Sequence, residues 1–377
     1  MRKIKVLEVI RQGLIGGGES HVIDVVKFLD RSIFEPYVIS FTDGPMISEL
    51  EAMEVKSHII PTQKAFDTHI WSKISKFIDE NEIDLIHAHG SRAQSNVFWS
   101  ARKKRKPLIY TVHGWSFHDD QKVFAQKVRV ISEKFMVNMA DMVINVSRSN
   151  QQTGLKKIGK YNNRVINNGI DLNKFSSKVS ASELKATLQI PKDAIVVGCI
   201  MRMTKQKNPM GMLRAFRQAN QQVGNLHLLL VGDGELMPQI KAYIDKHSLE
   251  SNVTLTGNRK DIPQLLSMID IYCLPSLWEG LPLSLLEAMA MRKAIIATRV
   301  DGTKELIQEG VNGLIIEPND TKSLAEKVVF LSKQKEIRTE YGRLAESLII
   351  RDHSVTKMVK EIEEVYFSLL NKKFEND

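Results

Sequence analysis

Two acidic residues, Glu279 and Glu287, stand eight positions apart in a largely apolar stretch. Gly280 interrupts the apolar pattern and Pro282 occupies a position where helices commonly begin, so the sequence predicts a helix that runs to about Met291. The helical periodicity places Glu287 on or near the buried face, where a bare charge would be costly. Both carboxylates could accept hydrogen bonds from hydroxyl groups of a ligand.

The start of this predicted helix could also bind an anion. The backbone N–H groups of Gly280, Leu281 and Leu283 lie at the first turn, where helices leave N–H groups without an internal partner and the dipole is positive. A negatively charged ligand that carries hydroxyl groups would suit this arrangement. The plainer alternative is that Glu279 only favours the helix dipole, while Glu287 bonds a neighbouring arginine or backbone group.

Cations come directly after the predicted strand 195–201. Arg202, Lys205 and Lys207 precede a predicted helix over residues 210–219. An arginine offers a planar fork of donors and a lysine offers a point charge, and a diphosphate needs such compensation. The alternative is that these cations are ordinary surface residues.

A glycine-rich segment follows the first predicted strand, residues 5–10. Gly16, Gly17 and Gly18 precede an apolar pattern of helical spacing. Glycines let the backbone approach a ligand closely, and the helix beyond them would aim its N–H groups at the same place. The segment does not fit the dinucleotide fingerprint, which has spaced glycines and an acidic residue about 20 positions on. A plain tight connection is the alternative.

Histidines mark the ends of two predicted strands in the first half of the chain. His113 directly follows the strand 108–112, and His87 and His89 lie at the end of the strand 84–88. Ligands gather beyond the carboxyl ends of parallel strands, so His113 is a candidate to contact a reacting group, although a lone histidine is more often structural. Two histidines without a third ligand of convincing spacing are weak evidence for a metal, so we expect no metal site.

Short apolar strands alternate with helix-length segments, which predicts an α/β protein with parallel sheets covered on both faces. A length of 377 residues suits two domains, and a polar run over 176–182 marks the change between them. We therefore expect two Rossmann-like, doubly wound domains, 1–176 and 177–352, that face each other across a cleft. The strands are predicted at 5–10, 37–41, 57–60, 84–88, 108–112, 142–146 and 164–168, and then at 195–201, 226–231, 253–256, 270–274, 294–298 and 313–316.

The composition is that of a basic, soluble globular protein. A net charge of +9 favours anionic ligands, nucleic acid or an acidic membrane surface. The basic amphipathic pattern over 122–139 indicates either a core-packing helix with a solvated basic face or a surface for anionic lipid, and no nucleic-acid module is evident. The buried-type cysteines Cys199 and Cys273, the lack of a signal-peptide pattern and the lack of a membrane-spanning apolar run favour a cytoplasmic protein.

Taken together, these motifs resemble those of the retaining glycosyltransferases of family four, which have the GT-B fold. The two glutamates and the residues between them resemble the family's nucleotide-sugar signature, and residues 16–20 resemble its glycine loop. Residues 168–175 resemble the motif that closes the first domain. The segment 300–305 departs from the family pattern by carrying Asp301. The resemblance also implies that the terminal helix, predicted over 355–370, crosses back so that residues 353–377 complete the first domain.

The resemblance implies a role for each candidate residue. Glu279 would contact the sugar hydroxyls, Glu287 the ribose and His113 the region of the donor sugar. Arg202 and Lys207 would bind the diphosphate. The remaining donor contacts that the resemblance implies are Gly16, Gly17, Gly18, Gly232, Gly280, Leu281 and, near the nucleobase, Arg259.

We therefore expect a metal-independent, retaining hexosyltransferase that moves a sugar from a nucleoside diphosphate sugar, with UDP sugars favoured, to an acceptor hydroxyl. The acceptor would be a saccharide or a lipid-linked saccharide in the assembly of cell-surface polysaccharide, lipopolysaccharide or glycolipid. No cofactor is expected, because the nucleotide sugar is a substrate. Peripheral contact with an anionic membrane fits the basic surface.

Two alternatives stay open. One is a sugar-nucleotide epimerase or phosphorylase of the same fold. The other is a non-catalytic basic protein that binds membranes or nucleic acid.

Overall fold

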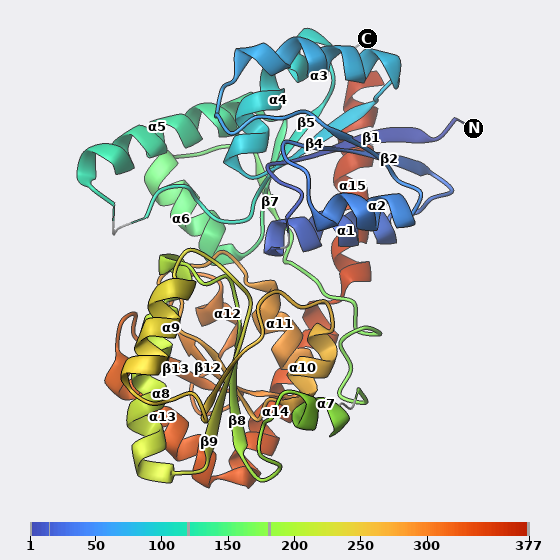
Figure 1. Ribbon diagram of the computed structural model, residues 1–377. Helices are drawn as coiled ribbons and strands as arrows, with labels where there is room; N and C mark the ends of the chain where they lie inside the picture. The colour runs from blue at the N-terminus through green and yellow to red at the C-terminus, as the bar shows by residue number, and fades with distance from the viewer. Residues whose placement is uncertain (1, 15, 119–120, 180–181, 375–377) are drawn as a thin grey trace. The chain divides into compact units, whose positions relative to one another are not determined.

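The computed structural model describes residues 2–14, 16–118, 121–179 and 182–374, and the chain divides into two compact units (Figure 1). The N-terminal unit consists of residues 1–169 and 355–377, and the C-terminal unit consists of residues 170–354. Each unit is built around one parallel sheet, so the predicted α/β class with two doubly wound domains is confirmed. No helix among the described residues is long and apolar enough to cross a membrane.

The N-terminal unit contains a seven-stranded sheet in the order β3-β2-β1-β4-β5-β6-β7. Its strands are β1 (Ile4–Ile10), β2 (Phe34–Ser40), β3 (Lys56–Ile59), β4 (Leu85–His89), β5 (Leu108–Val112), β6 (Met142–Asn145) and β7 (Asn163–Val165). Its helices are α1 (Gly17–Phe28), α2 (Pro45–Ala52), α3 (Thr68–Glu80), α4 (Ser91–Lys103), α5 (Val123–Met139), α6 (Arg148–Ile158) and α15 (Val355–Phe374).

Both faces of this sheet are covered, as the near-continuous apolar character of its strands requires. Val6 packs with residues of α1 and α15 on one face, whereas its neighbour Leu7 packs with residues of α3 and α4 on the other. The change of side between successive residues is the ordinary alternation of a strand. Helix α15 contributes Ile362, Val365 and Tyr366 to the first of these cores, so the end of the chain completes the N-terminal unit.

The C-terminal unit contains a six-stranded sheet in the order β10-β9-β8-β11-β12-β13. Its strands are β8 (Ile195–Ile200), β9 (Leu226–Val231), β10 (Val253–Leu255), β11 (Ile271–Leu274), β12 (Ala294–Thr298) and β13 (Leu314–Ile316). Its helices are α7 (Ser182–Thr187), the 3₁₀ turn η1 (Lys205–Lys207), α8 (Pro209–Val223), α9 (Met237–Lys246), α10 (Ile262–Met268), α11 (Leu283–Ala290), α12 (Thr303–Leu306), α13 (Thr321–Lys333) and α14 (Lys335–Asp352).

The change of unit lies at Gly169 and Ile170, before the boundary that the sequence predicts at 176. The backbone N–H of Ile170 donates to the carbonyl oxygen of His353 at 2.9 Å, and Ile170 forms an isolated parallel bridge with Ser354. Residues from 170 onward are therefore attached to the C-terminal unit. The polar run that suggested the boundary is a connection within that unit, because polarity marks exposure and not the place where contacts change.

Candidate functional site

The carboxyl ends of β8 and β11 bring together residues that the sequence assigns to a nucleotide sugar. These strands pair in parallel, so the segments 202–207 and 276–281 leave the sheet at the same edge. Two hydrogen bonds join the segments: Leu277 N–H donates to Gln206 O at 2.7 Å, and Gln206 Nε2 donates to Trp278 O at 2.9 Å.

Lys207 and Glu279 form an ion pair at this edge, with 2.5 Å between Nζ and Oε1. Only 13% of the Lys207 side chain and 6% of the Glu279 side chain are exposed. Removal of either partner would leave a poorly solvated charge, so each residue constrains the other. An ammonium group has three N–H donors, so Lys207 can bind Glu279 and a phosphate oxygen at the same time.

Helix α11 begins beside this ion pair. Pro282 is its N-cap, and the carbonyl oxygen of Pro282 accepts from the N–H groups of Leu285 and Leu286. A Cβ atom on Gly302 would lie 1.8 Å from the carbonyl oxygen of Gly280, so the backbone of the loop before α12 lies directly on the start of α11. This close approach requires glycine and fixes the backbone of Gly280.

The other candidate donor contacts occupy different positions in the same unit. Glu287 is half-buried in α11, and Arg202 is exposed directly after β8. Gly232 has a φ of +123°, and a Cβ atom there would lie 2.1 Å from the carbonyl oxygen of Met201, so the ends of β8 and β9 approach closely. Only glycine accommodates both constraints.

Arg259 forms an ion pair with Asp261, two positions further along the chain. Its Nε and Nη2 atoms donate to the two carboxylate oxygens of Asp261 at 2.8 and 2.6 Å. These bonds lower the pKa of Asp261, and they raise the pKa of Arg259. A role of Arg259 at the nucleobase therefore stays a prediction that would require this pair to accept a further partner.

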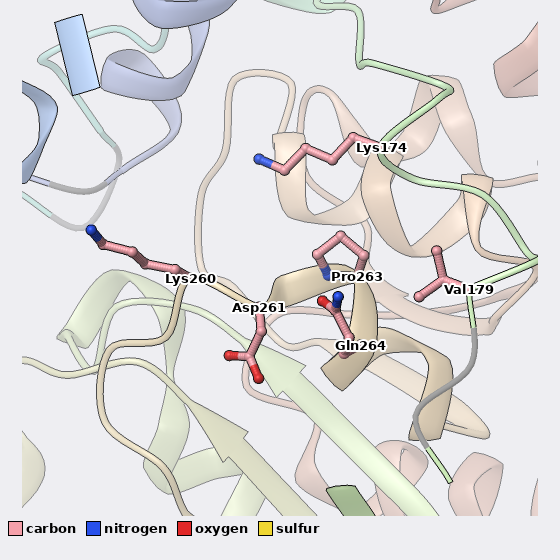
Figure 2. Close-up of a pocket in the computed structure, with 6 residues that line it drawn as sticks. All are labelled: Lys174, Val179, Lys260, Asp261, Pro263 and Gln264. Atoms are coloured by element: carbon pink, nitrogen blue, oxygen red, sulfur yellow. The ribbon is translucent and has the colours of Figure 1, made fainter. Parts of the chain in front are cut away.

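A pocket of about 440 Å³ lies next to the Arg259–Asp261 ion pair. Figure 2 shows the side chains that line it, among them two lysines and one aspartate, with Asp261 directly before α10 and Gln264 in its first turn. None of the residues assigned to the donor lines it. The lining residues are Lys174, Val179, Lys260, Asp261, Pro263 and Gln264.

The N-terminal unit gathers four histidines at the carboxyl edge of its sheet. His87 and His89 end β4, His113 follows β5, and His21 comes from α1. The ring centroids of His87 and His89 are 4.2 Å apart, and those of His21 and His113 are 4.8 Å apart. The glycine segment reaches the same place, because a Cβ atom on Gly18 would lie 3.7 Å from Cδ2 of His113.

A buried carboxylate fixes the protons of this cluster. Glu8, in β1, is fully buried, and its carboxylate accepts from His89 Nε2 at 2.6 Å and from the hydroxyl of Tyr366 at 2.8 Å. With its proton on Nε2, His89 presents the lone pair of Nδ1, which lies 3.2 Å from His113 Nε2. His113 therefore donates through Nε2 and carries a lone pair on Nδ1.

The pKa values agree with this arrangement. Burial lowers the pKa of His113 well below its ordinary value, and the nearby ring of His21 adds to the effect. Burial and the charge of His87 lower the pKa of His89 to about 4. Burial raises the pKa of Glu8, but the charges and hydrogen bonds of His87 and His89 outweigh it and hold this pKa below its ordinary value. At neutral pH, His89 and His113 are therefore neutral imidazoles.

Comparisons with known proteins agree with the two units. Residues 15–174 match Glycosyltransferase Family 4, and residues 180–347 match Glycosyl transferases group 1. The chain belongs to glycosyltransferase family four. This glycosyltransferase is similar to a UDP-Gal:alpha-D-GlcNAc-diphosphoundecaprenol alpha-1,3-galactosyltransferase of Escherichia coli, with 26% identity over 98% of both chains. It is also 27% identical to an N-acetyl-alpha-D-glucosaminyl L-malate synthase of Bacillus anthracis, over 81% of this chain and 80% of that one.

Solved structures support the fold. HepE from Anabaena in complex with UDP-glucose has a TM-score of 0.87 and 24% identity, and the match covers 97% of this chain and 100% of that one. WaaG, a glycosyltransferase involved in lipopolysaccharide biosynthesis, has a TM-score of 0.78 and 14% identity over 96% and 99% of the two chains. The predicted GT-B fold of this glycosyltransferase is therefore confirmed.

Sequence reasoning missed three residues of this glycosyltransferase that belong to the histidine cluster or bond to it. Glu8 interrupts a strand that is buried on both faces, and a lone acid in such a strand is the signal that could have been used. His21 lies in the fourth position after Gly17, and Tyr366 comes from the far end of the chain. No spacing in the sequence links α15 to β1, so only the fold reveals the contact of Tyr366.

The expectation of no metal site rested on finding only two histidines in the sequence. The fold places one ring nitrogen each of His21, His89 and His113 within 4.8 Å of one another, and it also gathers Glu8 with His87 and His89. In the second group the hydrogen bonds to Tyr366 and Thr111 occupy both nitrogens of His87. In the first group Nε2 of His21 is buried and has no hydrogen-bond partner among the described residues. Sequence reasoning therefore missed a group of three histidines whose ring nitrogens could bind a metal ion.

Proposed function

We propose that this glycosyltransferase is a retaining, metal-independent hexosyltransferase that transfers a sugar from a UDP sugar to a hydroxyl group of a lipid-linked saccharide, in the assembly of a cell-surface glycan. The buried Lys207–Glu279 pair beside the start of α11 carries the proposal. It provides a cation for a diphosphate and a carboxylate for sugar hydroxyls within one small region. The galactosyltransferase of Escherichia coli acts on a diphosphoundecaprenol-linked sugar, and HepE binds UDP-glucose, which supports this choice of substrates.

The chemistry follows from where charge develops. When the bond between sugar and diphosphate breaks, negative charge grows on the departing diphosphate, and Arg202 and Lys207 would stabilise it. Glu279 would position the sugar by accepting hydrogen bonds from its hydroxyls, and Glu287 would do the same for the ribose. In the N-terminal unit, neutral His113 would accept a hydrogen bond from the donor sugar through Nδ1.

A donor screen tests this function directly. UDP-glucose, UDP-galactose, UDP-N-acetylglucosamine and GDP-mannose are compared by thermal stabilisation, and UDP release is then measured with and without a polyprenyl-diphosphate-linked sugar. We expect stabilisation by a UDP sugar, UDP release that depends on the acceptor, and an α-linked product by NMR. An epimerase would convert the donor sugar without releasing UDP, a phosphorylase would require phosphate, and a β-linked product would exclude retention.

Chelation tests metal independence. Dialysis against EDTA and phenanthroline, followed by elemental analysis, should leave turnover unchanged and find less than one transition-metal ion per chain. Loss of turnover that added zinc restores would show that the histidine cluster holds a metal in the active enzyme and would overturn this part of the proposal.

A further inference from the structure

Helix α5 exposes apolar side chains along one face. Phe124 is 80% exposed, Ile131 69%, Val128 50% and Phe135 41%. These residues follow one another at intervals of four, three and four positions, which places them in line on a helix. The ring of Phe135 contacts that of Phe66, which is itself 37% exposed. We call these five residues the α5 stripe.

Most of the stripe lies away from the face through which α5 packs on its own unit, although Phe135 also contacts α4, through the ring of Phe98. Glu133, Met136 and Val137 are the buried residues of the helix, and they lie on the opposite side from the stripe. Of the two alternatives that the sequence left open, the core-packing helix with a solvated basic face does not describe the four stripe residues of α5, because their apolar side chains lie on the solvent side. Exposed apolar groups in such a line mark an interaction surface.

The exposed charged residues of α5 itself are all positive. Lys127, Arg129 and Lys134 are exposed on α5. The only acidic residue of the helix is Glu133, which is buried and accepts hydrogen bonds from Ser91 and Tyr110. A partner that covers this face must therefore offer apolar groups together with negative charge.

We propose that α5 docks this protein on a bilayer that contains anionic lipid. The α5 stripe would enter the boundary between headgroups and acyl chains, while Lys127 and Lys134 contact lipid phosphates. Figure 1 shows α5 at the periphery of the N-terminal unit. This inference adds a membrane partner to the proposed function and rests on it, because a lipid-linked acceptor would lie in such a bilayer.

Vesicle flotation without any donor tests the docking. The full chain is mixed with vesicles of phosphatidylcholine alone or with 30% phosphatidylglycerol, at low and at high salt. We expect binding only to the anionic vesicles and weaker binding at high salt. The double variants Phe124→Ser/Ile131→Ser and Lys127→Gln/Lys134→Gln should each weaken that binding roughly tenfold or more.

A matched control replaces exposed apolar residues elsewhere. Phe330 and Ile350, in the C-terminal unit, are 41% and 56% exposed, and Phe330→Ser/Ile350→Ser should bind vesicles like the wild type. Unchanged melting temperatures would show that the stripe variants fold. Equal vesicle binding by all variants, or no binding by the wild type, would overturn the inference. A dimer in sedimentation that the stripe variant abolishes, without vesicle binding, would assign the face to a second copy and would also overturn it.

Turnover separates this inference from the proposed function. With a short-chain, water-soluble acceptor, the stripe variants should retain wild-type turnover, and with the acceptor in anionic vesicles they should lose most of it. If the wild type turns over no donor but still binds vesicles through the stripe, the docking stands and the proposed function fails.

Discussion

At the scale of single residues, the Lys207–Glu279 pair makes a sharp prediction. Lys207→Met leaves a carboxylate of which 6% is exposed without its cation, so we expect a loss of about 3 kcal/mol in the free energy of unfolding. We also expect turnover to fall about 100-fold or more, because the cation no longer stabilises the departing diphosphate. Denaturant titration and donor-dependent UDP release measure the two effects.

A double variant separates the effect of Lys207 on stability from its effect on turnover. Lys207→Met combined with Glu279→Gln removes both charges, so most of the lost stability should return. Turnover should stay low. Recovery of turnover in the double variant would contradict the assignment of Lys207 to the diphosphate, and Lys241→Ala, an exposed lysine of α9, serves as the neutral reference.

The hydrogen bonds of Glu8 set a second prediction at this scale. Glu8→Gln supplies an amide that can donate to His89 Nε2, so His89 would carry its proton on Nδ1 and His113 would exchange its own proton from Nε2 to Nδ1. Long-range ¹⁵N NMR spectra of the imidazoles report this exchange, and turnover should fall because His113 no longer offers an acceptor. His227, bonded to Thr254 in the other unit, should keep its signals. An unchanged His113 spectrum in the variant would show that Glu8 does not determine which nitrogen of His113 carries the proton.

At the scale of elements, the loop before α12 and the start of α11 depend on one glycine. Gly302→Ala would place a Cβ atom 1.8 Å from Gly280 O, so either segment must shift, and we expect a loss of about 2 kcal/mol in stability together with weaker UDP binding. Thermal unfolding with and without UDP measures both. Unaltered UDP affinity would mean that the start of α11 does not contact the nucleotide.

At Gly17, unlike Gly302, the fold leaves room for a side chain. No atom lies within 4 Å of a Cβ atom built on Gly17, and this residue is the first of α1, so Gly17→Ala should leave stability unchanged or slightly higher. If the donor occupies the open space beside Gly17, the added methyl group should still decrease the affinity for the UDP sugar. Calorimetric titration decides this, and full affinity in the variant would remove Gly17 from the donor site.

At the scale of the whole molecule, the buried histidines couple folding to pH. The pKa of His89 is about 4 in the folded protein and about 6.5 when unfolded, so the unfolded chain binds a proton first as the pH falls. The free energy of unfolding should therefore decrease between pH 6.5 and pH 4, with about 3 kcal/mol from this residue. The difference between wild type and His89→Gln in denaturant titrations isolates the contribution, and parallel pH profiles would show that His89 is already protonated in the fold.

The sequence by itself determined the architecture and the C-terminal candidate residues. Strand and helix periodicities are local, so the order of elements was readable. Arg202, Lys207 and Glu279 became candidates through their places near a strand end or a helix start together with the resemblance to the family's motifs, and their roles stay predictions. The extent of β7 and the unit boundary were less accurate, since hydrogen bonds such as Ile170 to His353 join distant parts of the chain.

Only the tertiary structure decided which side chains meet and which faces stay exposed. Glu8, His89 and Tyr366 come from three distant segments, and their contact depends on how α15 packs against the sheet. The apolar residues of α5 have the same composition and spacing as a core-packing helix, so their exposure could not be inferred from the pattern. Periodicity records that a helix has an apolar face, but packing with the rest of the chain determines whether that face is buried.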